Sequence, residues 1–439
     1  MIPLLVKKLL VRSGIARHLP MTARLTDGGS EHVHYYSDKI LAAPIAELRD
    51  PATFPEIGGV DVVNLNLGAP QFDSPLSTGR LSVDRHGKPS AWGLPALRET
   101  ISGHYRRRDK RFFDPRDEVF ITHGATGAYS AVLDAFVNPG DRVVVFDPCS
   151  PLFAVGAKSR RASISWVPTT TESGVLKYDA DTLSAALRGA KLLVLADPTN
   201  PTGASFTPDA VEHLLWAASR SDVLIYQDES FRRFRYDGAQ GTLNSRPASF
   251  CRTLSAGSIT QTYGLGSARV GWLAGPRHLM KACALAANLS APFVPTVCQQ
   301  LALRELEAED ELFGPVLEEF RVRRRYTADR LKTIGITAEA PASGYFFWLD
   351  VSPFNLDGRT FAERLMKEHR VLVGPGCVFG PSSANHVRLS FAIEDGRLRE
   401  GLARLATFVA KLRGQPTPVV KQQETAPVLS ERPPTFTRV

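Results

Sequence analysis

Short apolar runs separated by longer amphipathic stretches dominate the chain between residues 66 and 300. The clearest runs are VVVF (143–146), LLVLA (192–196), VLIYQ (223–227) and VGWLAG (270–275). Continuous apolar runs are typical of strands buried on both faces of a parallel sheet. Helical patterns lie between them at residues 126–136 and 209–219, and Thr207-Pro208 is a helix-start signal. This alternation predicts a large, doubly wound α/β domain over residues 66–300.

The pattern changes after residue 300. Residues 305–331 are predicted to form one long, charged amphipathic helix. Shorter strand-like pieces follow it: GYFFWLD (344–350), VLVGPG (371–376) and HVRLSFA (386–392). These features predict a smaller α+β domain built from residues 301–413 together with residues 30–65. Residues 414–439 contain five prolines and almost no apolar periodicity, which predicts a disordered tail.

The first 29 residues form a basic segment that begins MIPLLVKKLLVR. Lys7, Lys8 and Arg12 interrupt its apolar stretch, so no uncharged core of a secretory signal remains. No apolar run in the chain reaches the roughly 18–20 residues of a membrane span. The segment can form a basic amphipathic helix on a membrane surface, or a helix packed on its own protein or on a partner subunit. We favour the packed helix.

Composition narrows the class of protein. With 439 residues, 43% of them hydrophobic and 22% charged, the chain has enough apolar side chains to form packed cores. The net charge of +8 is modest and the basic residues are scattered, so nucleic acid is not an expected partner. Five cysteines without a C-x-x-C pair argue against a disulfide framework and a thiolate zinc site. We therefore expect a cytoplasmic protein without a metal.

Four motifs carry the candidate chemistry. They are GATGAYSAV (124–132), DPTNPTGASF (197–206), YQDES (226–230) and SITQTYGLGSARVGW (258–272). The first precedes a helix, whose N-terminal N–H groups can bind a phosphate. The second and third follow strands, which places Asn200 and Asp228 at the sheet edge where open α/β sheets bind ligands. Ser258 and Arg269 of the fourth suit a phosphate monoester, and a buried carboxylate suits a protonated ring nitrogen.

In this order and spacing, the motifs resemble those of the class I/II aminotransferases, which are fold-type I enzymes that use pyridoxal 5'-phosphate (PLP). The resemblance covers nearly all of residues 35–412. Further matching motifs are NLNLGAPQFDSP, WGLPALRETI, NPGDRVVVFDP and VLVGPGCVFG with HVRLSFA. The resemblance implies a fold-type I structure, with a large cofactor-binding α/β domain and a small α+β domain. It also implies a homodimer, because the sites of this family lie at the subunit interface.

The resemblance assigns roles to individual residues. It implies that Asn200 donates a hydrogen bond to the phenolic oxygen of the cofactor, and that Asp228 pairs with its pyridinium nitrogen. It implies that Arg388 binds the substrate α-carboxylate, with help from the backbone at Gly68. The residues implied to hold the cofactor phosphate are Gly124, Ala125, Thr126, Ser258 and Arg269.

Several positions depart from the family pattern. The family places its Schiff-base lysine eight residues before the phosphate arginine, and here that position is Gln261. A glutamine amide forms no imine and accepts no proton at neutral pH. Ser150 occupies the position of an aromatic ring that usually stacks on the pyridine, and Phe231 that of a tyrosine that usually bonds the phenolic oxygen. Lys88 stands roughly where the family often has a tyrosine that reaches the phosphate across the dimer.

These observations lead to one main functional hypothesis. It is a PLP-dependent, aminotransferase-like enzyme that acts on an amino acid or keto acid and holds PLP or pyridoxamine 5'-phosphate non-covalently. Lys88 is an alternative base, although a surface or phosphate-contacting lysine is the simpler interpretation. Two rivals remain: a non-catalytic protein that binds adducts of PLP and amino acids, and an ordinary aminotransferase with an engineered Lys-to-Gln change. Divergence at Ser150 and Phe231 as well as Gln261 favours a natural origin.

Overall fold

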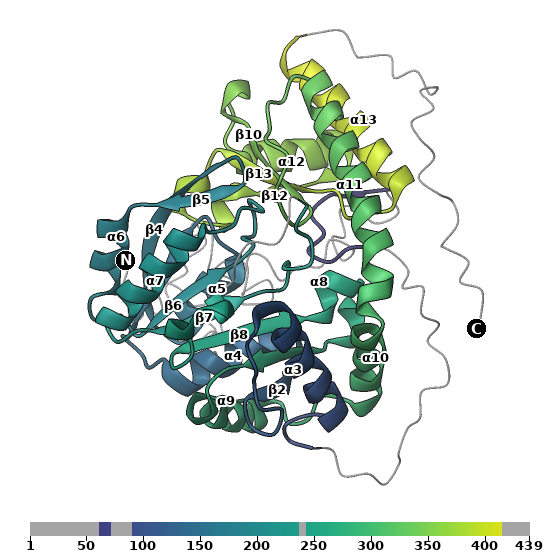
Figure 1. Cartoon of the computed structure of the whole chain (residues 1–439). Helices are drawn as coiled ribbons and strands as arrows, with labels where there is room; N and C mark the ends of the chain where they lie inside the picture. The colour runs from purple at the N-terminus through teal and green to yellow at the C-terminus, as the bar shows by residue number, and fades with distance from the viewer. Residues whose placement is uncertain (1–60, 72–89, 237–242, 415–439) are drawn as a thin grey trace, which may run out of the picture.

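The computed structural model describes residues 61–71, 90–236 and 243–414. Within these ranges the chain forms a large α/β domain and a smaller α+β domain, drawn in the lower and upper parts of Figure 1. The predicted N-terminal segment 1–29, most of residues 30–65 and nearly all of the predicted tail 414–439 lie outside the described residues. No described helix combines the length and the apolar character that crossing a bilayer requires.

An eight-stranded mixed sheet forms the centre of the large domain. In spatial order its strands are β2 (Val119–Thr122), β9 (Gly271–Ala274), β8 (Thr253–Ser258), β7 (Leu224–Asp228), β6 (Leu192–Ala196), β3 (Arg142–Asp147), β4 (Ser163–Glu172) and β5 (Val175–Tyr178). Strands β8, β7, β6, β3 and β4 run parallel to their neighbours in this series, as the apolar runs in β3, β6 and β7 predict.

The fourth apolar run does not follow the prediction. Strand β9 lies antiparallel to both of its neighbours, β8 and β2. The interpretation of this run as a parallel strand was wrong, because burial on both faces does not determine strand direction. Between β8 and β9 the chain makes the short helix α8 (Ile259–Tyr263) and the 3-10 helix η9 (Gly266–Ala268), and it returns beside the strand it has just left.

Helices cover both faces of the sheet. They are α3 (Pro95–Asp109), α4 (Gly124–Phe136), α5 (Pro151–Ser159), α6 (Ala180–Leu187), α7 (Pro208–Arg220) and α9 (Arg277–Ser290). Val143 and Val145 of β3 pack in one core cluster with residues of α4 and α9. Val144 lies in another cluster with residues of α6 and α7. This alternation, the period of two of a β-strand, makes the three-layer, doubly wound architecture that the sequence predicts.

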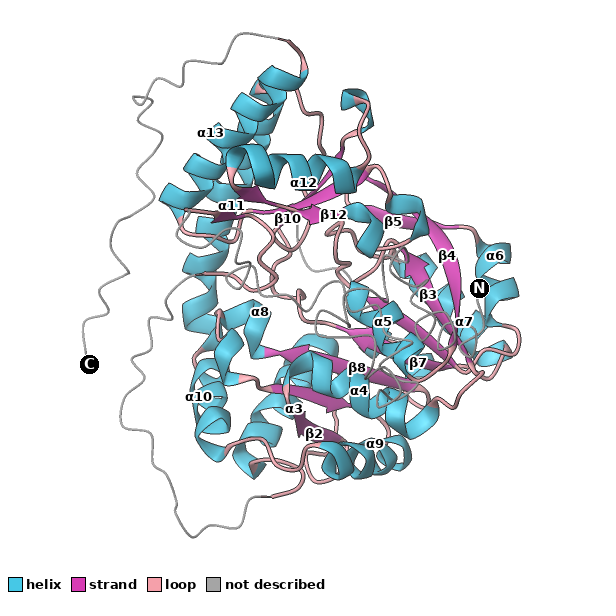
Figure 2. Cartoon of the chain, turned by 180° about the vertical axis from the view of Figure 1, so that it is seen from behind, coloured by secondary structure: helices cyan, strands magenta, loops and turns pink. Residues whose placement is uncertain are grey.

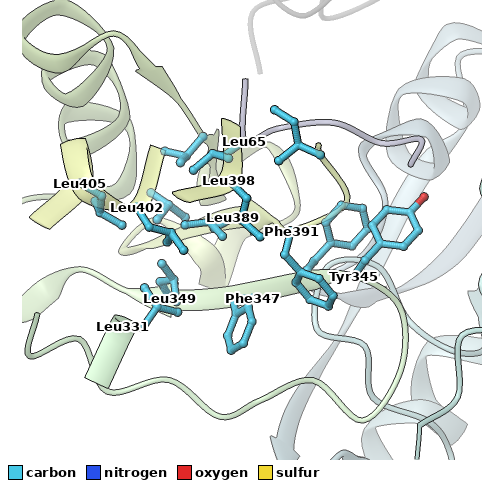
Figure 3. Packing of buried hydrophobic residues seen from close by; sticks show 14 of the residues in the cluster. Leu65, Leu331, Tyr345, Phe347, Leu349, Leu389, Phe391, Leu398, Leu402 and Leu405 are labelled. Carbon is cyan, nitrogen blue, oxygen red and sulfur yellow. The ribbon is translucent and has the colours of Figure 1, made fainter. Parts of the chain in front are cut away.

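The small domain has an antiparallel sheet of β10 (Phe346–Asp350), β13 (His386–Ser390) and β12 (Gly374–Pro375). Strand β1 (Val63–Asn64) pairs with β11 (Val371–Leu372), so the described N-terminal segment joins this domain. Helices α11 (Glu309–Thr333), α12 (Gly358–His369) and α13 (Asp395–Leu412) accompany the strands, as Figure 2 shows. In Figure 3, Leu65 lies in the same apolar core as Leu389 and Leu398.

The predicted single helix over residues 305–331 is two helices. Helix α10 (Thr296–Glu307) and α11 are separated by one residue, Ala308, which caps both of them. The backbone angles of Ala308, φ −92° and ψ 3°, are outside the regular α-helical values and interrupt the helix. Amphipathic periodicity continues across this residue, so the hydrophobic pattern alone does not reveal the break.

Candidate active site

The first turn of α4 and an arginine from the β8–β9 connection form a close contact at one end of the site. Gly124 has φ +70°, and a Cβ placed on it would lie 2.7 Å from Nη2 of Arg269. Only glycine allows this approach together with this backbone angle. Arg269 itself has φ +53° and is exposed. Its guanidinium donates a 3.2 Å hydrogen bond to the carbonyl of Gly266 and forms no ion pair with a carboxylate of the described residues.

The structure adjusts the predicted position of the glycine motif. Strand β2 ends at Thr122, and helix α4 begins at Gly124 rather than after the motif. Gly124, Ala125 and Thr126 therefore form the first turn of the helix, where backbone N–H groups lack intrahelical acceptors. Free N–H groups at a helix start, beside an arginine without a carboxylate partner among the described residues, form a cradle that suits a phosphate.

Ser258 lies directly before the short helix α8, and Gln261 lies within it. Ser258 ends β8 and caps α8, and its hydroxyl accepts a 3.1 Å hydrogen bond from the N–H of Thr260. Gln261 lies in the middle of the helix. Its Oε1 atom is buried and has no hydrogen-bond partner among the described residues, and the same holds for Oγ1 of Thr260. Two buried polar atoms on neighbouring residues are thus left without a protein partner.

The carboxylate of Asp228 lies at the C-terminal edge of the sheet. Asp228 is the last residue of β7, and its Oδ1 accepts a 2.9 Å hydrogen bond from the N–H of Ser230. Burial raises the pKa of Asp228, and the hydrogen bonds from Ser230 oppose that shift. No arginine or lysine of the described residues forms an ion pair with it. A ligand cation such as a protonated ring nitrogen would supply the missing charge.

Arg388 on β13 is held from several sides. Only 7% of its surface is exposed. Its Nη1 donates to Oδ1 of Asn200 at 3.0 Å, and its Nη2 donates to Oδ1 of Asn66 at 2.9 Å. The guanidinium carbon lies 4.1 Å from the ring centre of Phe346 and 4.9 Å from that of Phe379. The protein therefore fixes the plane of this guanidinium.

No carboxylate of the described residues pairs with Arg388. Burial lowers its pKa to about 10, because the charged form loses its hydration and no anion compensates. Its Nε atom is also buried without a hydrogen-bond partner in the described part of the chain. A buried guanidinium in this state is suited to an anionic ligand. The bond to Asn200 connects the small domain to the large domain at this point.

The other predicted positions vary in their surroundings. Gly68 lies on the same segment as Asn66. Its carbonyl accepts a 2.9 Å hydrogen bond from the hydroxyl of Tyr345. Ser150 precedes α5 and its side chain makes no cap hydrogen bond. Phe231 is buried and its ring packs edge-on against Tyr345 at 5.2 Å and Phe346 at 5.6 Å. Lys88 lies outside the described residues.

Sequence reasoning missed two parts of the site. Asn66 accepts a hydrogen bond from Arg388. It lies in the NLNLGAP motif, but nothing in the sequence indicates that Arg388 is its partner. The second part is a buried network beside Asp228. The hydroxyl of Tyr105 donates to Oε2 of Glu229 at 2.7 Å, and burial raises the pKa of Glu229. Arg232 pairs with Asp109 in the same network. The acidic residue directly after Asp228 in YQDES was the available signal.

Taken together, the described residues fit a phosphorylated, protonated heterocycle and a carboxylate. The cradle at Gly124 suits the phosphate, Asp228 suits a ring nitrogen, and Arg388 suits a carboxylate. A large mixed sheet and a small antiparallel sheet, with these groups between them, define the class of fold-type I aminotransferases, enzymes that depend on PLP. The comparisons with known proteins agree with this class.

The family "Aminotransferase class I and II" matches residues 60–405, and the chain belongs to it. The chain is 30% identical over 367 residues to the arginine–pyruvate transaminase of Pseudomonas aeruginosa, covering 81% of this chain and 92% of the relative. It is 28% identical over 366 residues to the aspartate/prephenate aminotransferase of Thermus thermophilus, covering 80% of this chain and 92% of the relative.

Solved structures agree in fold. An aromatic aminotransferase from Pyrococcus horikoshii superposes with a TM-score of 0.75 at 26% identity, covering 81% of this chain and 97% of that structure. The protein is thus an aminotransferase-family enzyme with the fold-type I architecture, and its family implies PLP as cofactor and amino acids or keto acids as substrates.

Proposed function

We propose that the protein binds PLP or pyridoxamine 5'-phosphate without a covalent bond to residue 261, and acts on an amino acid or keto acid. The observation that carries the proposal is Gln261, which stands eight residues before Arg269, where the family has its lysine. An amide nitrogen is neither a nucleophile nor a base at neutral pH, so this side chain forms no imine. The close approach of Arg269 to the glycine start of α4 and the carboxylate of Asp228 at the end of β7 nevertheless support binding of the cofactor.

The chain's own residues then have limited tasks. When bound, the cofactor supplies an electron sink for bonds at the substrate Cα. Gly124, Ser258 and Arg269 would hold the phosphate, and Asp228 would keep the ring nitrogen protonated. Arg388 would orient the substrate by its carboxylate. The position of its guanidinium between Phe346 and Phe379, rather than in solvent, supports this role.

The proposal is tested by borohydride reduction of the PLP-loaded protein, followed by mass analysis of its peptides. We expect no pyridoxyl group on residue 261. The variant Gln261→Lys should acquire one, because Ser258 and Arg269 still frame the position. The unmodified protein and the variant serve as matched samples, since they differ at one side chain only.

Two results would contradict the proposal. A pyridoxyl group on Lys88 of the unmodified protein would make that lysine the covalent partner. If a normally folded protein binds no cofactor, the assignment of Gly124, Ser258 and Arg269 to the cofactor phosphate is wrong. A panel of amino acids and keto acids then separates an enzyme from a protein that only binds: absence of product with every member would favour the non-catalytic alternative.

We further propose a homodimer. The support is an apolar stripe on and directly after α9, where Leu285, Leu289 and Phe293 are 64%, 80% and 45% exposed. They stand at intervals of four residues, so that Leu285 and Leu289 share one face of the helix. Large exposed apolar side chains in a row are typical of a protein interface. Light scattering of the purified protein tests the assembly, and a monomer for the parent chain would contradict it.

A further inference from the structure

A loop of the small domain is bonded to the end of a strand of the large domain. The loop comprises residues 376–383 and connects β12 to β13. It meets the C-terminal end of β3, where the N–H of Cys149 donates a 2.8 Å hydrogen bond to the carbonyl of Phe379. Strands β3 and β6 are parallel neighbours in the sheet. The loop therefore meets the same sheet edge as Asn200, which follows β6 and bonds to Arg388.

The side chain of Asp147, the last residue of β3, makes a second bond between the domains. Its Oδ2 accepts a 3.0 Å hydrogen bond from the N–H of Ser382, in the short 3-10 helix η12 (Pro381–Ser383). Gly380 packs against the other oxygen so closely that a Cβ placed on it would collide with Oδ1 of Asp147. Burial raises the pKa of Asp147, and the hydrogen bonds from Ser382 oppose that shift. A buried carboxylate is costly unless it is hydrogen-bonded, so Ser382 stabilises the charged form of Asp147.

The same loop carries one of the two rings that hold Arg388. Phe379 is 2% exposed, and the guanidinium carbon of Arg388 lies 4.9 Å from its ring centre. The backbone of Phe379 is bonded to Cys149, so a movement of the loop away from β3 would displace the ring. A planar guanidinium packed on an aromatic ring keeps its orientation only while the ring stays in place. The large domain thus acts on Arg388 through Phe379 as well as directly through Asn200.

We propose that Asp147 is a positioning residue for Arg388: its carboxylate holds the loop 376–383 against the large domain and so keeps the Phe379 ring on the guanidinium. The inference rests on the proposed function, because it requires that Arg388 binds the substrate carboxylate. Asp147 acts through the loop and contacts neither the substrate nor the cofactor. Its loss should therefore weaken the binding of acids at Arg388 and leave cofactor affinity unchanged.

The experiment uses variants from both sides of the contact. Asp147→Ala removes the acceptor for the N–H of Ser382, and Gly380→Ala places a methyl group against Oδ1 of Asp147. Each should weaken keto acid binding by about 2- to 30-fold in isothermal titration of the cofactor-loaded protein. Asp147→Asn keeps an oxygen that accepts the same hydrogen bond, and should recover most of the parent's affinity. Because both changes act on one contact, the double variant should lose little more than either single variant.

Hydrogen exchange of the apo-protein follows the loop without any ligand. Peptides that span residues 376–383 should exchange faster in Asp147→Ala than in the parent. Thr169→Val is the matched control, because it removes a 2.9 Å hydrogen bond to the backbone carbonyl of Asp147 and leaves the contact between the domains intact. It should bind keto acids as the parent does. An equal loss of affinity in Thr169→Val would assign the effect to the end of β3 itself and overturn the proposal.

Failure of this inference is distinguishable from failure of the proposed function. If the parent protein binds the cofactor but no keto acid, the assignment of Arg388 to a carboxylate is wrong, and this inference is wrong with it. If the parent binds keto acids and Asp147→Ala binds them equally well, only the role of Asp147 is wrong. Equal losses of cofactor and keto acid affinity would show a general disturbance of the site and would also contradict the positioning role. Thermal unfolding of each apo variant confirms that it folds, and if Asp147→Ala does not fold, Gly380→Ala decides the outcome.

Discussion

The two sides of the site differ in how far protein groups provide the hydrogen-bond partners of their polar side chains. On the small-domain side, the proposed carboxylate wall consists of Arg388, Asn66, Phe346 and Phe379. Two nitrogens of the guanidinium bond to protein oxygens, and its Nε lacks a partner among the described residues. On the large-domain side, the cofactor floor is the set of residues proposed to lie at the cofactor, Asp228, Ser258, Gln261 and Arg269, with Thr260 beside them on α8. There, Oε1 of Gln261 and Oγ1 of Thr260 are buried without a partner, and Arg269 contacts no carboxylate of the described residues.

The contrast indicates which side is built by folding and which is completed by a ligand. Arg388 is oriented before any substrate arrives, so binding loses little side-chain entropy there. The floor instead holds the carboxylate of Asp228, whose burial is costly in the apo-protein and becomes favourable when a ligand supplies a positive charge. Substitutions in the wall should therefore change substrate recognition, whereas substitutions in the floor should change cofactor binding.

The largest effect is expected from Arg388→Lys. Lysine keeps the positive charge, but it loses the planar fork that bonds Asn66 and Asn200 and lies between the two phenylalanine rings. We expect affinity for keto acids and amino acids to fall by about 2–5 kcal/mol, the range for truncating one partner of a buried charge pair. Isothermal titration of the cofactor-loaded protein with a panel of keto acids measures it.

The matched control for that variant is Arg359→Lys, on α12 of the same domain, whose guanidinium contacts Cys377 rather than the site. Its ligand affinities should equal those of the parent. If Arg388→Lys binds every acid as well as the parent does, then the carboxylate wall recognises no carboxylate, and the difference between the two sides of the site loses its functional meaning.

The second effect concerns the floor. Arg269→Ala should weaken PLP and pyridoxamine 5'-phosphate binding by about 1.5–3 kcal/mol, the range for a hydrogen bond to a charged group. The unfolding free energy of the apo-protein should change by less than about 0.5 kcal/mol, because the side chain is exposed and makes one hydrogen bond to its own loop. Cofactor titration and urea unfolding measure the two quantities.

Arg325→Ala, on an exposed position of α11, is the control for a lost surface charge. It should affect neither cofactor affinity nor stability. Equal cofactor titrations for Arg269→Ala and Arg325→Ala would remove the phosphate assignment. A large loss of apo-protein stability in Arg269→Ala would show that folding, and not the ligand, depends on this arginine.

The sequence predicted the two sides unequally. The positions of Asp228 and Asn200 at the sheet edge could be predicted, because residues that end or follow buried parallel strands gather at one edge of the sheet, a rule that needs only the strand pattern. The predicted direction of β9 was wrong, because an apolar run carries no information on strand direction. The partners of Arg388 could not be inferred either: Asn66 and Arg388 are 322 positions apart, and only tertiary packing brings them together. A contact between residues so far apart in the chain leaves no pattern in the local sequence around either of them.

The third prediction uses Asp228→Asn to show that the floor is costly without its ligand. Burial raises the folded-state pKa of Asp228 above the ordinary value of 3.8, so the ionised carboxylate destabilises the fold at neutral pH. Removing the charge should stabilise the apo-protein at pH 7 by about 0.5–2 kcal/mol, a common gain when a strained site is relieved. Cofactor affinity should fall in the same variant.

The sign of the pH dependence follows from the same shift. Well below pH 3.8 the carboxyl group is protonated in both the folded and the unfolded chain, and Asp228 imposes no penalty. The penalty develops as the pH rises from that value through the raised folded-state pKa. The stability advantage of Asp228→Asn should therefore be full at pH 7 and shrink toward pH 4. Urea unfolding of both proteins across this range checks it, and an advantage that grows on acidification would contradict the assignment.

The smallest expected effect comes from Ser150→Phe, which adds to the floor the aromatic ring that the family usually has. The substitution removes no cap hydrogen bond, because the Ser150 hydroxyl makes none at the start of α5, and the side chain is only partly buried. A ring stacked on the heterocycle contributes about 0.5–1.5 kcal/mol, so cofactor affinity should rise by about 2- to 10-fold. Keto acid affinity should stay unchanged, because Arg388 and its partners lie on the other side of the site. Parallel titrations with pyridoxamine 5'-phosphate and with a keto acid separate the two responses. If the variant changes keto acid affinity and leaves cofactor affinity unaltered, then Ser150 belongs to the substrate side of the site and not to the cofactor floor.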